Sequence, residues 1–334
     1  MADTYTQVKD ITVNITAAVA AGSVGLGFPL VIQGMAAAAV AYAECASLAE
    51  VEAAGFKAET EVYKACAVIF AQSNKPKTVA VCATDGKVAE WLTANAVKGF
   101  RQIVPILGGE DSTVAELVTV VSALENKMLF LELATLEELP ATQSERVVAV
   151  VYGGASDYAN AAVVGASAGL AAGSFTYKNL ILTGIEAENL TAAQVNAIHD
   201  AGGMCVIKKA GDIVTSEGKT TDGEYIDIVD SKDYIISNIV YQGQKLLNNS
   251  DKVSFDNVGI SQLENVVTGV LADAYANGII ATNEDGTAAY STNFATRADV
   301  TASDRAARTY NGGAFSFDLA GAIHNATING TLVV

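Results

Sequence analysis

The sequence has 334 residues, of which 51% are hydrophobic and 17% are charged. This composition is too apolar for a disordered chain, and the length suffices for one large domain or two ordinary ones. The formal net charge of −17 and the lack of a basic stripe argue against a nucleic-acid-binding protein. The apolar runs are rich in alanine and shorter than a membrane span, so we expect no membrane insertion.

The first 25 residues are predicted to form an extended arm and a linker. Ile11, Val13 and Ile15 alternate with polar residues, which is the period of a β-strand. The segment 17–27 is rich in alanine and glycine and favours a flexible connection over a helix. No basic stretch leads into an apolar core at the start of the sequence, so no secretory signal is expected.

Residues 26–210 alternate short apolar runs with amphipathic stretches, which predicts an α/β domain with a largely parallel sheet. Helices are expected to begin at Ser47, Thr135 and Thr191, because an acid or amide follows each hydroxyl residue three positions later. The expected strands are residues 28–33, 78–83, 102–107, 128–133, 147–152, 179–183 and 204–208.

The last third of the chain has the pattern of an α+β domain. Two strands are expected at 212–215 and 224–229, followed by two amphipathic helices, the second capped by Ser261. Alternating apolar residues at 315–319 and 326–334 predict strands again. The fold class is therefore α/β plus α+β.

Four cysteines, Cys45, Cys66, Cys82 and Cys205, are scattered without the C-x-x-C spacing of a metal or redox site. Three of them lie among small apolar residues, so we expect buried, reduced thiols. The glycine pairs at 108–109 and 153–154 follow expected strands but lack the spacing of a nucleotide-binding loop. We expect neither a cofactor nor a metal.

A match to the G-x-S-x-G nucleophile motif is centred on Ser167. An α/β-fold hydrolase that uses Ser167 and His324 is therefore the alternative function. However, residues 157–164 before the motif are expected to be helical, and the motif lies in a run of small residues that favours close backbone packing. The two histidines, His199 and His324, belong to no catalytic or zinc motif. We expect no catalytic residue.

Three stretches of the last third occur in an order typical of contractile tail sheath proteins. They read GEYIDIVDSKDYIISNIVYQGQKLLNN, VGISQLENVVTGVLADAYANGII and RTYNGGAFSFDLAGAIHNATINGTLVV. Through them the chain resembles the contractile phage tail sheath family, which includes sheaths of myophages and of R-type phage-tail-like bacteriocins. The resemblance covers residues 215–334 well and continues more weakly through SLAEVEAAGF, YANAAVVGASAGLAAGSFTYKNL and the VNITAAVA of the arm.

The resemblance implies a structural protein and not an enzyme. Subunits of this family form hexameric rings stacked around a tail tube, and the sheath contracts to drive the tube through a cell envelope. The implied organisation is an N-terminal arm and linker at 1–25, an outer α/β domain at 26–210, and a C-terminal sheath domain at 211–334 that ends in an exchanged strand.

The family's terminal strands pair with sheets of neighbouring subunits, a form of β-augmentation. The resemblance also implies contacts with a tail tube protein and with baseplate and tail terminator proteins, after assembly in the cytoplasm of a bacterial host. The product is a virion tail or a released phage-tail-like particle. Strand-pairing positions carried over are Ile11, Val13, Ile15, Ile328, Leu332 and Val334, and possible tube contacts are Lys245 and Lys252.

Overall fold

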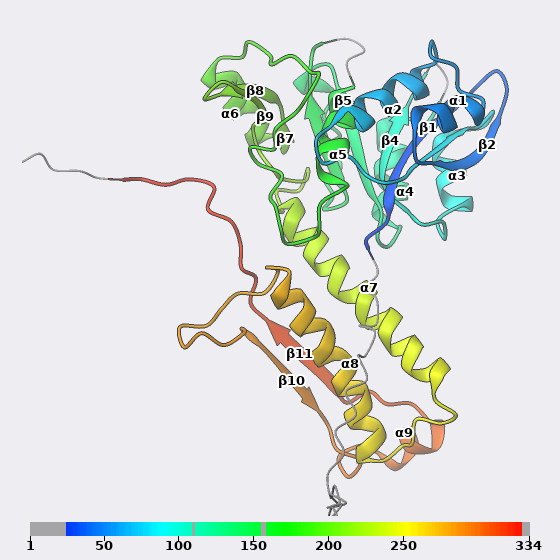
Figure 1. Cartoon of the computed structure of the whole chain (residues 1–334), viewed down its shortest axis with the longest axis vertical. Coiled ribbons are helices and arrows are strands. Elements are labelled where there is room, and N and C mark those ends of the chain that lie inside the picture. Colours follow the sequence, from blue (N-terminus) through cyan, green and yellow to red (C-terminus); the bar gives the residue numbers. More distant parts are fainter. Residues whose placement is uncertain (1–24, 109–110, 155–157, 329–334) are drawn as a thin grey trace, which may run out of the picture.

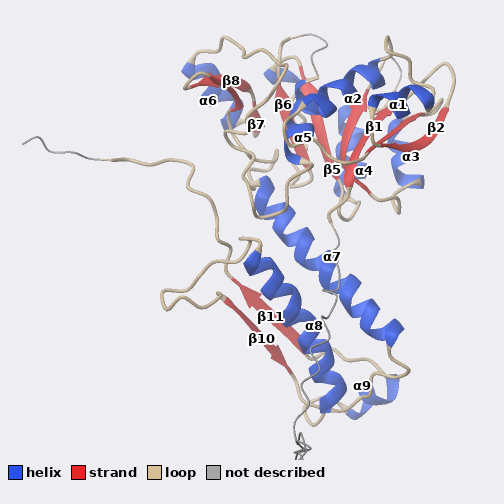
Figure 2. Cartoon of the chain, in the orientation of Figure 1, coloured by secondary structure: helices blue, strands red, loops and turns tan. Residues whose placement is uncertain are grey.

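The computed structural model describes residues 25–108, 111–154 and 158–328. It has two parts joined by one long helix (Figures 1 and 2). The first is a layered α/β part, and the second combines a helix with a small antiparallel sheet. The predicted mixed class, with parallel and antiparallel pairing, is confirmed.

The α/β part is built on a seven-stranded sheet in the order β2-β3-β1-β4-β5-β6-β7. All neighbouring pairs are parallel except β2 and β3. Every residue of β3 and β6 is buried, as expected for parallel strands covered on both faces. The strands are β1 (Phe28–Gln33), β2 (Val40–Cys45), β3 (Val79–Ala83), β4 (Phe100–Ile106), β5 (Met128–Leu133), β6 (Val147–Val151) and β7 (Gly203–Met204).

Helices cover both faces of this sheet, because alternate residues of each buried strand face opposite layers. One face packs against α1 (Leu48–Ala53), α2 (Glu61–Ala71) and α5 (Ala159–Ser167). The other packs against α3 (Val88–Ala94) and α4 (Val114–Ser122). A 3-10 turn, η1 (Leu136–Glu138), helix α6 (Ala192–Asp200) and the hairpin of β8 (Val206–Lys209) and β9 (Asp212–Thr215) complete this part.

The long helix α7 (Ile226–Asn249) runs from the α/β part into the C-terminal part, where it packs against α8 (Asn257–Ala276) (Figure 1). A two-stranded antiparallel sheet of β10 (Tyr290–Phe294) and β11 (Gly313–Phe317) follows. The chain segment that connects the two strands contains α9 (Ala302–Ala307). A small core that includes Ile235 of α7 and Leu271 of α8 holds this part together.

Several expected elements differ in the structure. The strand expected at 224–229 is wrong, because this segment enters α7. The strand expected at 179–183 is reduced to one bridge between Ile181 and Val214. The sequence patterns missed β2 and β10. Residues 326–328 form no strand, and the rest of that expected strand lies outside the described residues. The boundary expected after residue 210 falls in the turn of the β8–β9 hairpin and stays a prediction.

The predicted helix starts agree in part with the structure. Ser47 and Thr191 cap α1 and α6 as expected, and Thr191 forms the full reciprocal box with Gln194. Thr135 precedes η1 without a side-chain cap. Ser261 lies inside α8, whose N-cap is Asp256, so that prediction is wrong.

Candidate assembly interface

The small sheet of the C-terminal part has one packed and one polar face. Tyr290, Phe294 and Phe317 point to the core shared with α8, while Ser291 and Ser316 pair across the opposite face through hydroxyl groups 2.9 Å apart. Phe315 stacks on Phe317 with ring centres 6.3 Å apart, yet it remains 41% exposed. The packed face of β11 is thus only partly covered at Phe315.

The backbone pattern of this sheet shows which amide groups point outward. The Ala295 amide donates to the Gly312 carbonyl and the Asp318 amide to the Ala289 carbonyl, each at 2.9 Å. In an antiparallel ladder, hydrogen-bonded and non-hydrogen-bonded pairs alternate. Between these two bonds, the residue pairs that contain Ser291 and Asn293 are therefore the hydrogen-bonded ones. The backbone groups of Thr292 and Phe315, which form the pair between them, face away from the partner strand.

Both strands consequently have a free edge. Among the residues that the structure describes, β10 and β11 form a sheet with each other alone, apart from isolated bridges next to it. Unpaired edges of this kind are sites where a strand of another chain can add.

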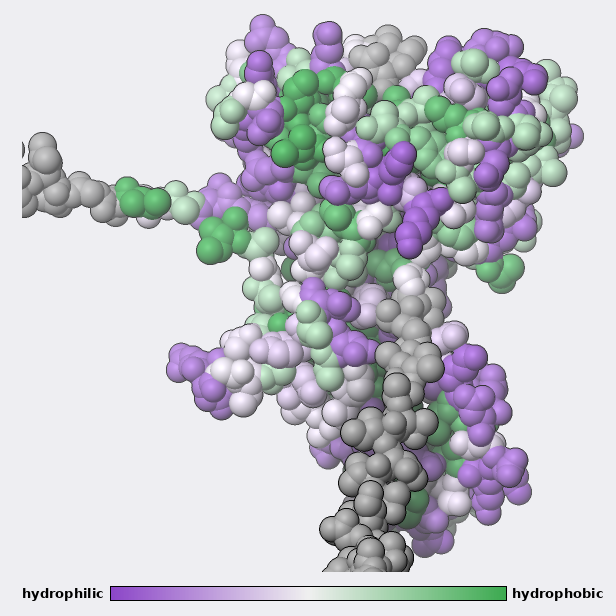
Figure 3. Space-filling model, viewed as in Figure 1, coloured by the Kyte–Doolittle hydropathy of each residue, from purple (hydrophilic) through white to green (hydrophobic). Residues whose placement is uncertain are grey.

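The sequence-predicted pairing residues lie mostly beyond the described part of the chain. Ile11, Val13, Ile15, Leu332 and Val334 are outside it. Ile328 is inside and 93% exposed, on an extended segment that leaves the body of the subunit (Figures 1 and 3).

The two predicted tube contacts are both exposed. Lys245 lies in the second half of α7, with its amine 5.7 Å from the Tyr241 ring centre, and Lys252 lies in the connection to α8. From its middle onward α7 exposes apolar side chains at helical spacing, Ile236, Val240 and Leu247.

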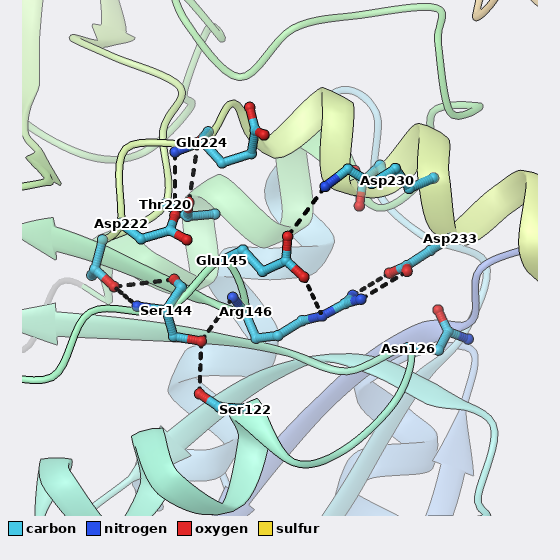
Figure 4. A network of polar contacts seen from close by, with 12 residues as sticks. Ser122, Asn126, Ser144, Glu145, Arg146, Thr220, Asp222, Glu224, Asp230 and Asp233 are labelled. Atoms are coloured by element: carbon cyan, nitrogen blue, oxygen red, sulfur yellow. Dashed lines mark hydrogen bonds and ion pairs between the residues drawn. The ribbon is translucent and has the colours of Figure 1, made fainter. Parts of the chain in front are cut away.

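The first half of α7 is fixed to the α/β part by a buried charged cluster. Arg101 of β4 donates to Asp230 at 2.5 Å and to Asp233 at 2.6 Å. Arg146, at the start of β6, forms two hydrogen bonds with the carboxylate of Asp233 (Figure 4). We call these four residues the α7 clamp. The hydroxyl of buried Tyr177 adds a 3.0 Å bond to Asp230.

The charges of the α7 clamp favour the ionised forms of Asp233 and Arg101. Burial alone would raise the pKa of Asp233, but the hydrogen bonds from Arg146 and the charge of Arg101 bring it below its usual value. Burial would likewise lower the pKa of Arg101, and the charges of Asp230 and Asp233 raise it instead. Two guanidinium groups and two carboxylates thus compensate one another in a site with little solvent.

The α7 clamp is not predicted by any of the sequence patterns above, although a signal for half of it is present. Asp230 and Asp233 are three residues apart and fall on the same side of α7 as Ile226 and Val229, which are buried. Acids on the apolar side of an amphipathic helix require a buried cationic partner. The partner Arg101 lies 129 residues from Asp230, and no local pattern connects the two.

A second buried cation lies beside the clamp. The Lys127 amine donates to the carbonyls of Lys98 and Phe100 at 2.7 and 2.5 Å and lies 4.2 Å from the Phe100 ring centre. Burial lowers the pKa of Lys127 from 10.5 to about 8, and the charge of Arg101 adds to this shift.

This lowered pKa predicts a pH effect on stability. Between pH 8 and 10.5 the unfolded chain holds the Lys127 proton more strongly than the folded chain, so raising the pH favours folding at this site. We expect the unfolding free energy of the wild type to increase relative to that of K127M between pH 7.5 and 9.5. Denaturant titrations at both pH values measure it, and a constant difference between the two proteins would refute the assignment.

The structure contradicts the interpretation of Ser167 as the nucleophile of a G-x-S-x-G motif. Ser167 is 2% exposed and lies in the last turn of α5, where its hydroxyl donates to the Val163 carbonyl at 2.9 Å. A nucleophile elbow instead needs an exposed serine on a sharp turn from strand to helix. His324 is hydrogen-bonded to the hydroxyl of Thr176, and His199, near the end of α6, is hydrogen-bonded to the hydroxyl of Ser216.

The other sequence-based expectations can be compared with the described residues. All four cysteines are buried and free, and burial raises the pKa of Cys82 to about 12. Within residues 25–108, 111–154 and 158–328, no group of three or more metal-binding side chains comes together. No helix in the same ranges is long and apolar enough to cross a membrane.

Comparison by sequence identifies no relative, since neither a protein-family model nor a curated protein matches the chain. Comparison by structure gives matches along the whole chain. The sheath of an extracellular contractile injection system, PVC, in the contracted state matches with a TM-score of 0.74 and 10% identity, covering 100% of this chain and 99% of that one. The contracted helical sheath of the anti-feeding prophage gives 0.69 and 12%, covering 99% of each chain.

A sheath tail protein from a bacterial genome has the same fold. The sheath tail protein Lin1278 from Listeria innocua matches with a TM-score of 0.57 and 13% identity over 81% of this chain and 89% of that one. At such low identities the likeness shows the architecture, and that architecture includes both parts of the subunit and the helix between them. The chain therefore has the fold of contractile sheath proteins.

Proposed function

We propose that this chain is a structural subunit of a contractile sheath, not an enzyme, and that it assembles into hexameric rings stacked around a tail tube. The observation that carries the proposal is the match to contracted sheath subunits over 99% or more of both chains. The free edges of β10 and β11 support it, because a polymer joined by β-augmentation needs open strands in every subunit.

The joints between subunits are proposed to be exchanged terminal strands. An N-terminal strand with Ile11, Val13 and Ile15, and a C-terminal strand with Ile328, Leu332 and Val334, would add to the β10–β11 sheets of neighbours. The exposure of Ile328 supports this assignment, because an apolar side chain that is bare in the single subunit gains from burial in an adjacent one.

Further partners follow from the same proposal. The second half of α7, which carries Lys245 and exposes Val240 and Leu247, together with Lys252 in the following connection, is the proposed contact with the tube protein, and baseplate and tail terminator proteins bind the ends. Copurification with the tube protein, compared between wild type and K245E/K252E, tests this contact, and equal recovery would refute it. Assembly is proposed to take place in the cytoplasm of a bacterial host.

The proposed mechanical work requires no nucleotide. An extended lattice stores free energy at assembly and converts to a contracted lattice with more surface buried between subunits. Contraction of isolated particles in the absence of nucleoside triphosphate would support this mechanism, and a strict nucleotide requirement would overturn it.

The first test is electron microscopy of the purified protein at high concentration. The full chain is expected to form hollow striated cylinders, whereas a truncation that lacks residues 327–334 is expected to remain as single subunits. The truncated protein must show the circular dichroism and thermal transition of the full chain, so that a loss of assembly is not a loss of folding. Single particles from both proteins, even after co-expression with a tube protein, would contradict the proposed function.

A further inference from the structure

Beyond Leu319, which packs on the core of the C-terminal part, the segment that follows β11 is exposed except at one side chain. Ile323 is 88% exposed and Ile328 is 93% exposed, but the His324 side chain is only 9% exposed. A buried imidazole in an otherwise exposed segment is an anchor, because it is the one residue whose side chain is removed from water there.

His324 contacts two segments of the α/β part and the start of α7. Its Nε2 lies 2.9 Å from the Thr176 hydroxyl, and its Nδ1 lies 3.9 Å from Oε1 of Glu217. Its ring meets the ring of Tyr225, the N-cap of α7, edge to face with centres 4.9 Å apart. The contacts join the end of the chain to the start of the long helix.

The charged groups around His324 are acids and amines in equal number. Glu217 pairs with Lys178 at 3.3 Å, and its pKa is lowered by the Gly218 amide and Lys178 against the effect of burial. Burial raises the pKa of Asp227, whose buried Oδ1 has no hydrogen-bond partner among the residues that the structure describes. Lys219 lies over the Tyr225 ring, 4.9 Å from its centre. Two carboxylates and two amines therefore surround the imidazole.

The segment from Asp318 to His324 also crosses between the two parts of the subunit. At its start the Ala320 amide donates to the Ile279 carbonyl of the C-terminal part at 2.9 Å, and at its end His324 reaches the α/β part. Between these points it borders a cavity of about 290 Å³. That cavity is lined by Thr176, Asp227, Ser231, Ile279, Leu319 and Gly321, among others.

We propose that residues 318–324 form a strap across this cavity, that His324 is the pin that fastens it, and that the pin carries tension from the C-terminal strand into the α/β part. The tension role rests on the proposed sheath function, whereas the fastening role does not. Without the pin, a pull on the terminal strand would act first on the single bridge between Leu319 and Ile280 and then on the five-residue strand β11. With it, the pull reaches Tyr225 and Thr176, next to the helix that the α7 clamp holds.

The fastening role is tested on the free subunit by amide hydrogen exchange of the full chain. We expect H324A to speed exchange at Ala320 by about fivefold to tenfold, the factor that corresponds to loss of one buried hydrogen bond and its neighbours. N325A is the matched control, because it changes the next, exposed residue. T176V removes the hydroxyl partner and keeps the histidine, so it tests the pin should H324A misfold.

The outcomes separate this inference from the proposed function. Equal exchange in wild type, H324A and T176V would overturn the pin. If wild-type cylinders form, those of H324A are expected to come apart at a lower guanidinium concentration than those of N325A, and equal resistance would overturn the tension role. If the wild type forms no cylinders, the tension role fails with the proposed function, while the exchange result still decides whether His324 fastens the strap.

Discussion

Replacing Asp233 with alanine is expected to cost about 3–5 kcal/mol of unfolding free energy, the range for removal of one partner from a buried ion pair. The variant leaves Arg101 buried with one carboxylate in place of two and removes the bidentate partner of Arg146. Equilibrium unfolding in guanidinium chloride measures the loss. Because Asp233 lies on α7, we also expect faster hydrogen exchange along the first turns of that helix.

The matched control for this variant is E145A. Glu145 pairs with Lys232 at 3.2 Å and lies 3.9 Å from the Nε of Arg146 (Figure 4). The Glu145 and Lys232 side chains are more than 40% exposed, and removal of Glu145 leaves both hydrogen bonds between Arg146 and Asp233 in place. Surface pairs of this kind contribute about 0–1 kcal/mol, so E145A is expected to be nearly neutral. Similar losses for D233A and E145A would show that the α7 clamp does not hold the helix.

Proline at position 315 is expected to abolish cylinder formation while leaving the subunit folded. The amide of Phe315 points to the free edge of β11, so its loss removes no bond within the β10–β11 ladder. It would remove a donor that an added strand requires, and the proline ring would obstruct the approach of that strand. Electron microscopy of F315P at high concentration measures the effect.

The control for that experiment is F315A, which removes the same aromatic ring and keeps the amide. We expect F315A to form cylinders and the unfolding free energies of the two variants to agree within about 1 kcal/mol. Cylinders from F315P would show that the free edge of β11 is not a joint. Failure of both variants to assemble would show that the aromatic ring of Phe315, and not its backbone amide, is required for assembly.

The α/β part could be predicted from sequence because its strands are short, continuously apolar and separated by capped helices. β1 and β5 occupy the predicted residues. β2 was missed because it consists largely of small residues and lies at the sheet edge, where burial is incomplete. β10 was missed because Ser291, Thr292 and Asn293 are polar, and only its pairing with β11 makes it a strand.

The start of α7 shows why local periodicity gave the wrong element. Residues 224–229 are rich in aromatic and β-branched side chains, as a strand is, but Ile226, Val229 and Asp233 also recur at helical spacing. Burial of Asp230 and Asp233 against Arg101 decides between the two patterns, and that contact is long-range. The predicted joints at the two ends of the chain depend on a second subunit, so no property of one chain determines them.

The length of α7 sets how stiff its attachment must be. A helix of 24 residues is about 36 Å long, since each residue adds about 1.5 Å. The clamp holds the helix at Asp233, about 24 Å from its far end, so a tilt of about 15° there would displace the far end by about 6 Å, more than the roughly 4.8 Å between paired strands. A tilt of that size would shift the β10–β11 edge, relative to a neighbouring chain, by more than the distance between two paired strands. The accuracy of strand pairing in a polymer would thus be determined at the opposite end of the subunit, by the few ångströms over which two arginines hold two aspartates.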